Sequence, residues 1–168
     1  EEDSSFIGRL WAWKISTLLA LDHPLTGGGF KAVLDGPIWD YYAPHTPQFT
    51  FLETPPIPEL SGSKAAHNIY FQVLGDHGFV GLFIFLMILA LALLTNIQNA
   101  AIGKARQVNW YHKLAGFLTL SLVGYGITGA NVSLAYFDLL YAVLGIVAVM
   151  TLRRQELTLQ GVSPANEA

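Results

Sequence analysis

Long apolar runs separated by short polar segments fill the second half of the chain. The first run occupies residues 79–98 and opens with the uncharged stretch FVGLFIFLMILALALLT. The second occupies residues 114–130, and the third occupies residues 134–152 with Asp138 near its start. A helix of about 20 apolar residues crosses the hydrocarbon core of a bilayer. The pattern therefore predicts three transmembrane helices.

The composition favours lipid as part of the solvent. Hydrophobic residues make up 52% of the chain and charged residues 12%, whereas soluble domains carry about 25% charged residues. The alternative is a set of buried core helices, but the rest of this chain is too short to cover three of them. No cysteine is present, so we expect neither disulfides nor a thiolate metal site. The chain lacks an initiator Met and a signal-peptide pattern, so we expect further spans upstream.

The positions of Lys and Arg predict the orientation in the membrane, because these residues concentrate in cytoplasmic loops. The basic residues that decide it are Lys104, Arg106, Lys113, Arg153 and Arg154. They assign residues 99–113 to a cytoplasmic loop and residues 153–168 to a cytoplasmic tail. Residues 1–78 then lie outside the cytoplasm. The net charge of −3 argues against nucleic acid as a partner.

The predicted fold class is therefore all-α: a polytopic membrane protein whose three transmembrane helices follow a partly helical extracytoplasmic loop. Residues 6–21 of that loop have helical character, and Trp11 and Trp13 are suited to a membrane interface. The Gly-rich stretch after them ends this helix.

Three further expectations concern the loop and the chain end. Residues 37–58 are rich in Pro and aromatic side chains, which indicates a long loop of the kind that carries function. A new helix is expected from Ala65 or Ala66 onward. Residues after Glu156 are expected to form a disordered tail.

The segment AHNIYFQVLGDHG contains the first candidate for chemistry, His67. His67 and Gly78 are eleven residues apart, close to three helical turns, so a continuous helix would place them on one face. An imidazole at the membrane surface can take a proton or hold a hydroxyl near neutral pH. The structural alternative is a histidine at a helix start that bonds to water or to a nearby carbonyl.

Arg9 and the glycine run are the candidates for binding an anion. A guanidinium is permanently charged and grips phosphate oxygens in bidentate fashion, although an interfacial Arg beside tryptophans can also simply reach toward water. The backbone N–H groups of Gly27 and Gly29 could face an anion, or the run could merely end a helix. A carboxylate such as Asp138 is costly in lipid, so Asp138 either has a functional role or pairs with another residue for structural reasons.

Metal and serine hydrolase sites are not predicted. No H-E-x-x-H motif occurs, and His67 and His77 are ten residues apart, which puts them out of phase on a helix. His23 and His45 lie on expected loops. No G-x-S-x-G motif is present.

Three motifs together carry a resemblance to a known family: RLWAWK from Arg9, PLTGGGF from Pro24, and AHNIYFQVLG from Ala66 leading into DHGFVG. The chain resembles the C-terminal half of the O-antigen ligase and polymerase superfamily of bacterial membrane proteins. It is most similar to O-glycosylation ligases associated with exosortase systems. The resemblance covers roughly residues 5–95. It departs at Trp13, where the family's Arg motif often has a Leu.

The resemblance implies a metal-independent glycosyltransferase without a cofactor, in the bacterial inner membrane with its large loop in the periplasm. The implied donor is a glycan on undecaprenyl diphosphate. The implied acceptor is a hydroxyl of lipid A core, of another glycan or of a protein. Arg9 and His67 match the family's catalytic positions. The candidate substrate-binding residues are Arg9, Gly27, Gly29, Asn68 and Tyr70.

The working hypothesis is that Arg9 binds the diphosphate and His67 activates the acceptor hydroxyl. This part of the protein alone is expected to be inactive. Two alternatives remain: a polymerase of the same superfamily, and a non-enzymatic membrane transport or scaffold protein. The oligomeric state is not predicted.

Overall fold

The computed structural model describes residues 2–48, 54–59 and 61–160, and every regular element in these ranges is helical. The all-α prediction is therefore confirmed for the described residues. By its contacts the chain divides into two units. The first comprises Glu1–Leu86 with Thr128–Ala135, and the second comprises Met87–Ile127 with Tyr136–Ala168.

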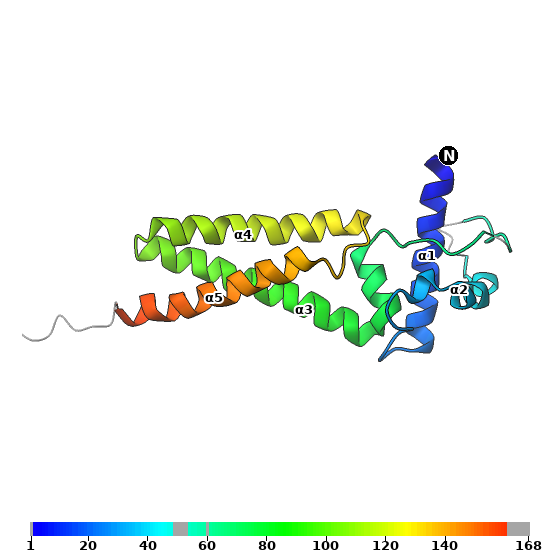
Figure 1. The fold of residues 1–168 in the computed structure, drawn as a ribbon, viewed down its shortest axis with the longest axis horizontal. Coiled ribbons are helices and arrows are strands. Elements are labelled where there is room, and N and C mark those ends of the chain that lie inside the picture. Colours follow the sequence, from blue (N-terminus) through cyan, green and yellow to red (C-terminus); the bar gives the residue numbers. More distant parts are fainter. Residues whose placement is uncertain (1, 49–53, 60, 161–168) are drawn as a thin grey trace, which may run out of the picture. The chain divides into compact units, whose positions relative to one another are not determined.

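The first unit is built on helix α1 (Glu2–Asp22), which packs against the short helices η1 (Ala32–Leu34) and α2 (Gly36–Tyr42) (Figure 1). The middle of α1 is buried on most sides, and this burial includes the polar residues Lys14 and Ser16. The buried core of this unit consists of Trp11, Ala12, Ile15, Leu19, Ala32, Val33, Trp39, Tyr42 and Ala66. The predicted helix over residues 6–21 is confirmed, with a few more residues at its start.

The two tryptophans of α1, which the sequence suggests as membrane-interface residues, both form hydrogen bonds inside the first unit. Trp11 is buried, and its indole N–H donates to the Pro55 carbonyl at 2.9 Å. The indole N–H of Trp13 donates to the Ala66 carbonyl at 2.7 Å. Both indoles therefore hold the extended segments that follow α2 against α1.

The Pro-rich stretch over residues 37–58 contains more helix than the sequence indicated. Asp35 caps α2 by accepting a hydrogen bond from the Ile38 N–H at 3.2 Å, and Pro37 occupies the first turn, where a missing N–H costs nothing. A single 3-10 turn, η2 (Ala43–His45), continues it. The part of the prediction that concerns residues 49–53 lies outside the described residues.

Helix α3 (Ile69–Ala105) begins later than predicted and is not continuous. Residues 65 and 66 are extended, and His67 has a left-handed backbone with φ 45°. Asn68 caps the helix, because its Oδ1 accepts the N–H groups of Tyr70 at 2.9 Å and Phe71 at 3.2 Å. Gly78 interrupts the helix with φ 67° and ψ −166°. The expectation that His67 and Gly78 share one face of a continuous helix is therefore wrong.

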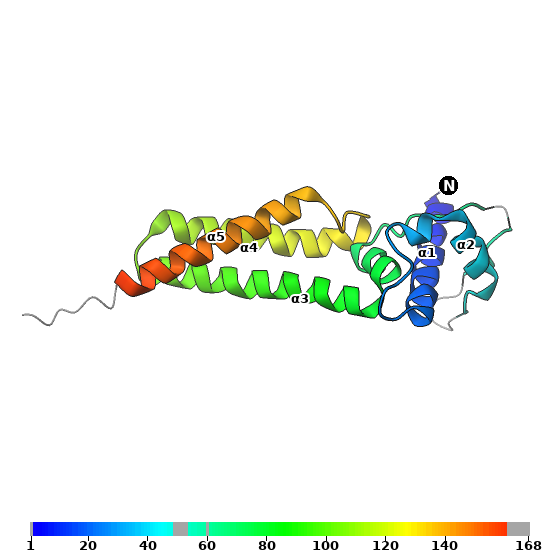
Figure 2. The ribbon, with the colours of Figure 1, turned by 60° about the horizontal axis from the view of Figure 1, so that its bottom comes forward.

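The second unit consists of the last part of α3, helix α4 (Asn109–Thr128) and helix α5 (Asp138–Gln160), which lie side by side (Figures 1 and 2). Polar bonds join them at buried positions. Asn96 Nδ2 donates to the Ala115 carbonyl at 2.7 Å, and the Tyr111 hydroxyl donates to the Met150 carbonyl at 2.6 Å. Arg154 donates to Gln98 Oε1 at 2.7 Å. Between α4 and α5, the turn η3 (Gly129–Asn131) leads into a segment that belongs to the first unit.

Two helical stretches are long and apolar enough to cross a membrane, Ile69–Ala105 and Asn109–Asn131. They correspond to the first two predicted spans. The third predicted span starts at residue 134, but α5 starts only at Asp138. Its uncharged stretch of residues 139–152 rises about 21 Å as a helix, against about 30 Å of hydrocarbon. The third span stays a prediction. The helix also runs past Glu156 to Gln160, where a disordered tail was expected, and residues 161–168 lie outside the described residues.

Candidate active site

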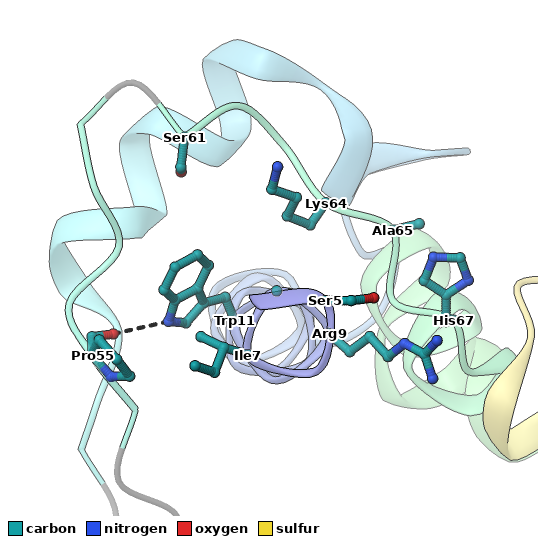
Figure 3. Close-up of a pocket in the computed structure, with 10 residues that line it drawn as sticks. Ser5, Ile7, Arg9, Trp11, Pro55, Ser61, Lys64, Ala65 and His67 are labelled. Atoms are coloured by element: carbon teal, nitrogen blue, oxygen red, sulfur yellow. Dashed lines mark hydrogen bonds between the residues drawn. The ribbon is translucent and has the colours of Figure 1, made fainter. Parts of the chain in front are cut away.

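A cavity of about 550 Å³ opens between the N-terminal half of α1 and the extended segment that precedes α3. Its lining residues are Ser5, Ile7, Gly8, Arg9, Trp11, Pro55, Ser61, Lys64, Ala65 and His67. Figure 3 looks along α1 and shows the extended segment curving around the helix. The cavity therefore joins residues that are far apart in the sequence, and it lies entirely within the first unit.

Arg9 and His67, the two predicted catalytic residues, both line this cavity. Figure 3 shows their guanidinium and imidazole groups extending to the same side of α1. Arg9 is half-buried, and its Nε is a buried donor without a hydrogen-bond partner among the described residues. A buried donor without a partner is costly, and an anion that entered the cavity would relieve that cost.

The segment around His67 is fixed by contacts from both sides. The Trp13 indole holds the carbonyl of the preceding residue, Ala66, and Trp13 also stacks on Phe71 with ring centroids 4.9 Å apart. The His67 N–H itself donates to the Ser133 hydroxyl at 2.9 Å. These bonds hold the backbone, while the imidazole remains exposed at the cavity. The side chain is thus positioned and accessible, as a base for an incoming hydroxyl must be.

Lys64 is a cavity residue that the sequence reasoning missed. It is exposed and lies over Gly8, where an added Cβ would come within 3.3 Å of the Lys64 Cγ. Gly8 therefore leaves the room that brings the lysine stem onto α1. Lys64 stands three residues before His67 in the sequence, but nothing in the sequence showed that it lines the same cavity as Arg9. The cavity thus holds two permanent or near-permanent cations.

The wall of the cavity opposite His67 is held by a buried lysine. Lys14 is 3% exposed, and its ammonium group donates to Thr54 Oγ1 at 2.7 Å and to Gln48 Oε1 at 3.3 Å. Burial lowers the pKa of Lys14. Together with the bond from Trp11 to Pro55, this anchors residues 54–55 to α1. Ser61, also in the wall, has a buried hydroxyl oxygen with no bonding partner within the described part of the chain.

The predicted anion contact of Gly27 and Gly29 is not supported by their geometry. Their N–H groups donate inside the protein, from Gly27 to His23 O at 2.8 Å and from Gly29 to Asp76 O at 2.9 Å. Gly28 likewise donates to Gly75 O at 2.9 Å. The physical reason for the glycines is packing: the backbone at Gly27 has φ 61° and lies so close to α3 that a Cβ would fall 2.5 Å from Asp76 C.

Asn68 and Tyr70 are not among the described residues that line the cavity. Asn68 is buried, and both polar atoms of its side chain are hydrogen-bonded. Oδ1 caps α3, and Nδ2 donates to the Ala130 carbonyl at 3.1 Å. These bonds give Asn68 a structural role, and its contact with substrate stays a prediction. Tyr70 lies half-buried in the first turn of α3 and contributes its N–H to the same cap.

Asp138 belongs to the second unit, not to the cavity. It is exposed and opens α5, where a carboxylate is favoured by the helix dipole. The position of Asp138 at the start of α5 thus favours a structural role for this residue. Within the described ranges, no group of three or more His, Cys, Asp and Glu side chains gathers in a way that could hold a metal ion.

Comparison with known protein families agrees with this picture. Residues 1–86, just over half of the chain, match the family described as O-antigen ligase. No curated protein and no solved structure gives a significant match. The matched region includes every residue that lines the cavity. The finer resemblance to ligases associated with exosortase systems stays a prediction. The chain belongs to the O-antigen ligase family.

Proposed function

We propose that this protein transfers a glycan from undecaprenyl diphosphate to an acceptor hydroxyl, in the cavity that Arg9 and His67 share. Family membership indicates glycan transfer of the ligase or polymerase type, and the two apolar helices together with the family indicate a membrane location. The observation that supports the site is the meeting of a guanidinium, an ammonium and an imidazole at one cavity.

Arg9 and Lys64 offset the charge of the donor in this proposal. The diphosphate leaving group gathers negative charge as its bond to the sugar breaks, and fixed cations that face it stabilise the transition state. The buried Nε of Arg9 has no hydrogen bond to another described residue to give up. Lys64 adds a second, exposed cation to the lining of the same cavity.

His67 acts on the acceptor. The acceptor oxygen bonds to the anomeric carbon, the bond from that carbon to the diphosphate oxygen breaks, and undecaprenyl diphosphate departs with the electron pair. The proton of the acceptor hydroxyl passes to the imidazole of His67 and from there to solvent. This chemistry requires neither a metal nor a cofactor, because the diphosphate is already a good leaving group.

The proposed location is the outer face of the bacterial inner membrane, with residues 1–78 in the periplasm. We propose ligation to a different acceptor, and extension of a repeat chain by a polymerase of the same type is the alternative. The acceptor is then lipid A core, a glycan or a protein.

The test is His67→Ala in the complete protein, reconstituted with a lipid-linked glycan donor and its acceptor. Transfer should fall by about 10²–10⁴-fold, while binding of undecaprenyl diphosphate to Arg9 and Lys64 stays unchanged. His45→Ala is the matched control, because His45 is an exposed histidine of the same unit that does not line the cavity. Undiminished transfer by His67→Ala would remove the imidazole from the mechanism. A product that grows in repeat number would identify a polymerase instead.

A further inference from the structure

The turn that follows α1, residues 23–30, is bonded to the point where α3 is interrupted. Phe79 N–H donates to the Pro24 carbonyl at 2.9 Å, and Val80 N–H donates to the same oxygen at 3.4 Å. Gly28 and Gly29 donate in the other direction, to carbonyls of residues 75 and 76. In Figures 1 and 2 the turn lies against the start of α3 in both views.

These hydrogen bonds replace the intrahelical ones that are lost where α3 is interrupted. The extended ψ of Gly78 takes Phe79 and Val80 out of the normal i to i−4 pattern, which leaves their N–H groups without an intrahelical acceptor. Phe79 is also where the long apolar run of α3 begins. Unsatisfied backbone groups are very costly at membrane depth. The turn therefore supplies the missing acceptor at the level where the chain enters the lipid.

Two large apolar side chains of this turn face outward. Leu25 and Phe30 are each 72% exposed. Leu25 follows Pro24, and the Phe30 ring lies edge-on to the His77 ring with centroids 4.7 Å apart, so both stand next to the start of the apolar run. Phe79 and Val80 at that start are exposed as well. Leu25 and Phe30 thus extend the exposed apolar surface of α3 sideways.

We propose that residues 23–30 form a membrane-inserted turn, with Leu25 and Phe30 placed at the boundary between lipid headgroups and acyl chains. The occupant of this surface is lipid, because the surface is continuous with the exposed face of a helix long and apolar enough to span a membrane. Burying two such side chains among acyl chains is favourable, because it removes apolar surface from water. The turn would hold α1, and with it the wall of the cavity, at a fixed depth.

The experiment uses single cysteines in a cysteine-free version of the complete protein, labelled with an environment-sensitive fluorophore. The variants are Leu25→Cys and Phe30→Cys, and the protein is reconstituted in vesicles that contain a lipid with a nitroxide on its acyl chain. Phe83→Cys on α3, 66% exposed, is the lipid-facing reference. Asp40→Cys on α2, an exposed polar position, is the aqueous reference.

Quenching at positions 25 and 30 should be several-fold greater than at position 40 and comparable with that at position 83. Quenching no greater than at position 40 would overturn the proposal, because the turn would then face water. Labelling is carried out in detergent before reconstitution. Failure of the folded protein to react there at positions 25 and 30, while position 83 reacts, would also overturn the proposal, since another part of the protein would then cover this surface.

Discussion

The backbone N–H of His67 donates a hydrogen bond to the side-chain oxygen of Ser133, which lies 66 residues further along the chain. His67 has φ 45°, and a non-glycine residue in this left-handed region costs about 1–2 kcal/mol. Such a conformation persists where its surroundings enforce it. The neighbouring bond from Asn68 to the Ala130 carbonyl ties the same two segments together. The linker between α4 and α5 therefore shapes the candidate site, although it lies outside the region matched by the family.

Removing the Ser133 hydroxyl should therefore misplace the imidazole. We expect Ser133→Ala to lower kcat for glycan transfer by about tenfold or less, the worth of one hydrogen bond, with KM for the donor unchanged. Ser133→Thr keeps the hydroxyl and should restore most of the rate. Kinetics on the complete protein would measure this. In a His67→Ala background the Ser133→Ala change should have no further effect, and an equal loss in that background would indicate a general structural role.

The two cations of the cavity should differ in their contribution. Arg9 has a buried donor and should contribute by direct, bidentate contact with phosphate. We expect Arg9→Ala to lower kcat on the order of a hundredfold, and Arg9→Lys to recover only part of it, because an ammonium cannot form the paired contact. Lys64→Ala should cost less, since Lys64 is exposed.

The same transfer assay measures these changes. Lys104→Ala is the control for charge alone, because Lys104 is an exposed lysine in the last turn of α3, in the second unit. If Lys104→Ala and Arg9→Ala reduced transfer equally, the effect would come from overall charge and not from the cavity.

Local patterns in the sequence predicted the features that depend on nearby residues. The helix over residues 6–21 and the uncharged start of the first span were predictable because both are runs of consecutive residues whose character is visible locally. Arg9 and His67 were identified from their motifs and the resemblance, and the fold brings them to one cavity.

Features that depend on distant partners could not be predicted in this way. The N–H groups of the glycine run appeared available because the carbonyls of residues 75 and 76 that accept two of them are more than 40 residues away. Asn68 appeared able to bind substrate for the same kind of reason, since its partner Ala130 belongs to a different part of the chain. The break at Gly78 was not predicted, because the residues on both sides of it form helix. Lys64 gave no signal at all without the position of α1.

Gly27 should be the least replaceable glycine of the turn after α1. An alanine Cβ there would lie 2.5 Å from two backbone atoms of α3, and φ is 61°. At Gly29, φ is 91° but no atom lies within 4 Å of the added Cβ. We expect Gly29→Ala to cost about 1–2 kcal/mol from backbone strain alone, and Gly27→Ala to cost clearly more because backbone atoms must move. Thermal unfolding in detergent measures both, and equal shifts in Tm would contradict the close approach of the turn to α3.

Tyr42 should make the first unit sensitive to alkaline pH. Burial, together with a 2.8 Å hydrogen bond to Asp22 and the charge of that carboxylate, raises the pKa of Tyr42 to about 12 from an ordinary 10.0. The folded state therefore holds the phenol proton more tightly than the unfolded state does. This contribution to stability is fully present below pH 10 and is lost as the pH rises toward 12.

Tyr42→Phe should be less stable than the parent by about 1 kcal/mol at neutral pH. The difference between their Tm values should shrink between pH 10 and pH 12. Unfolding curves of both proteins across that range measure this, and a constant difference would show that the phenol titrates alike in the folded and unfolded chains.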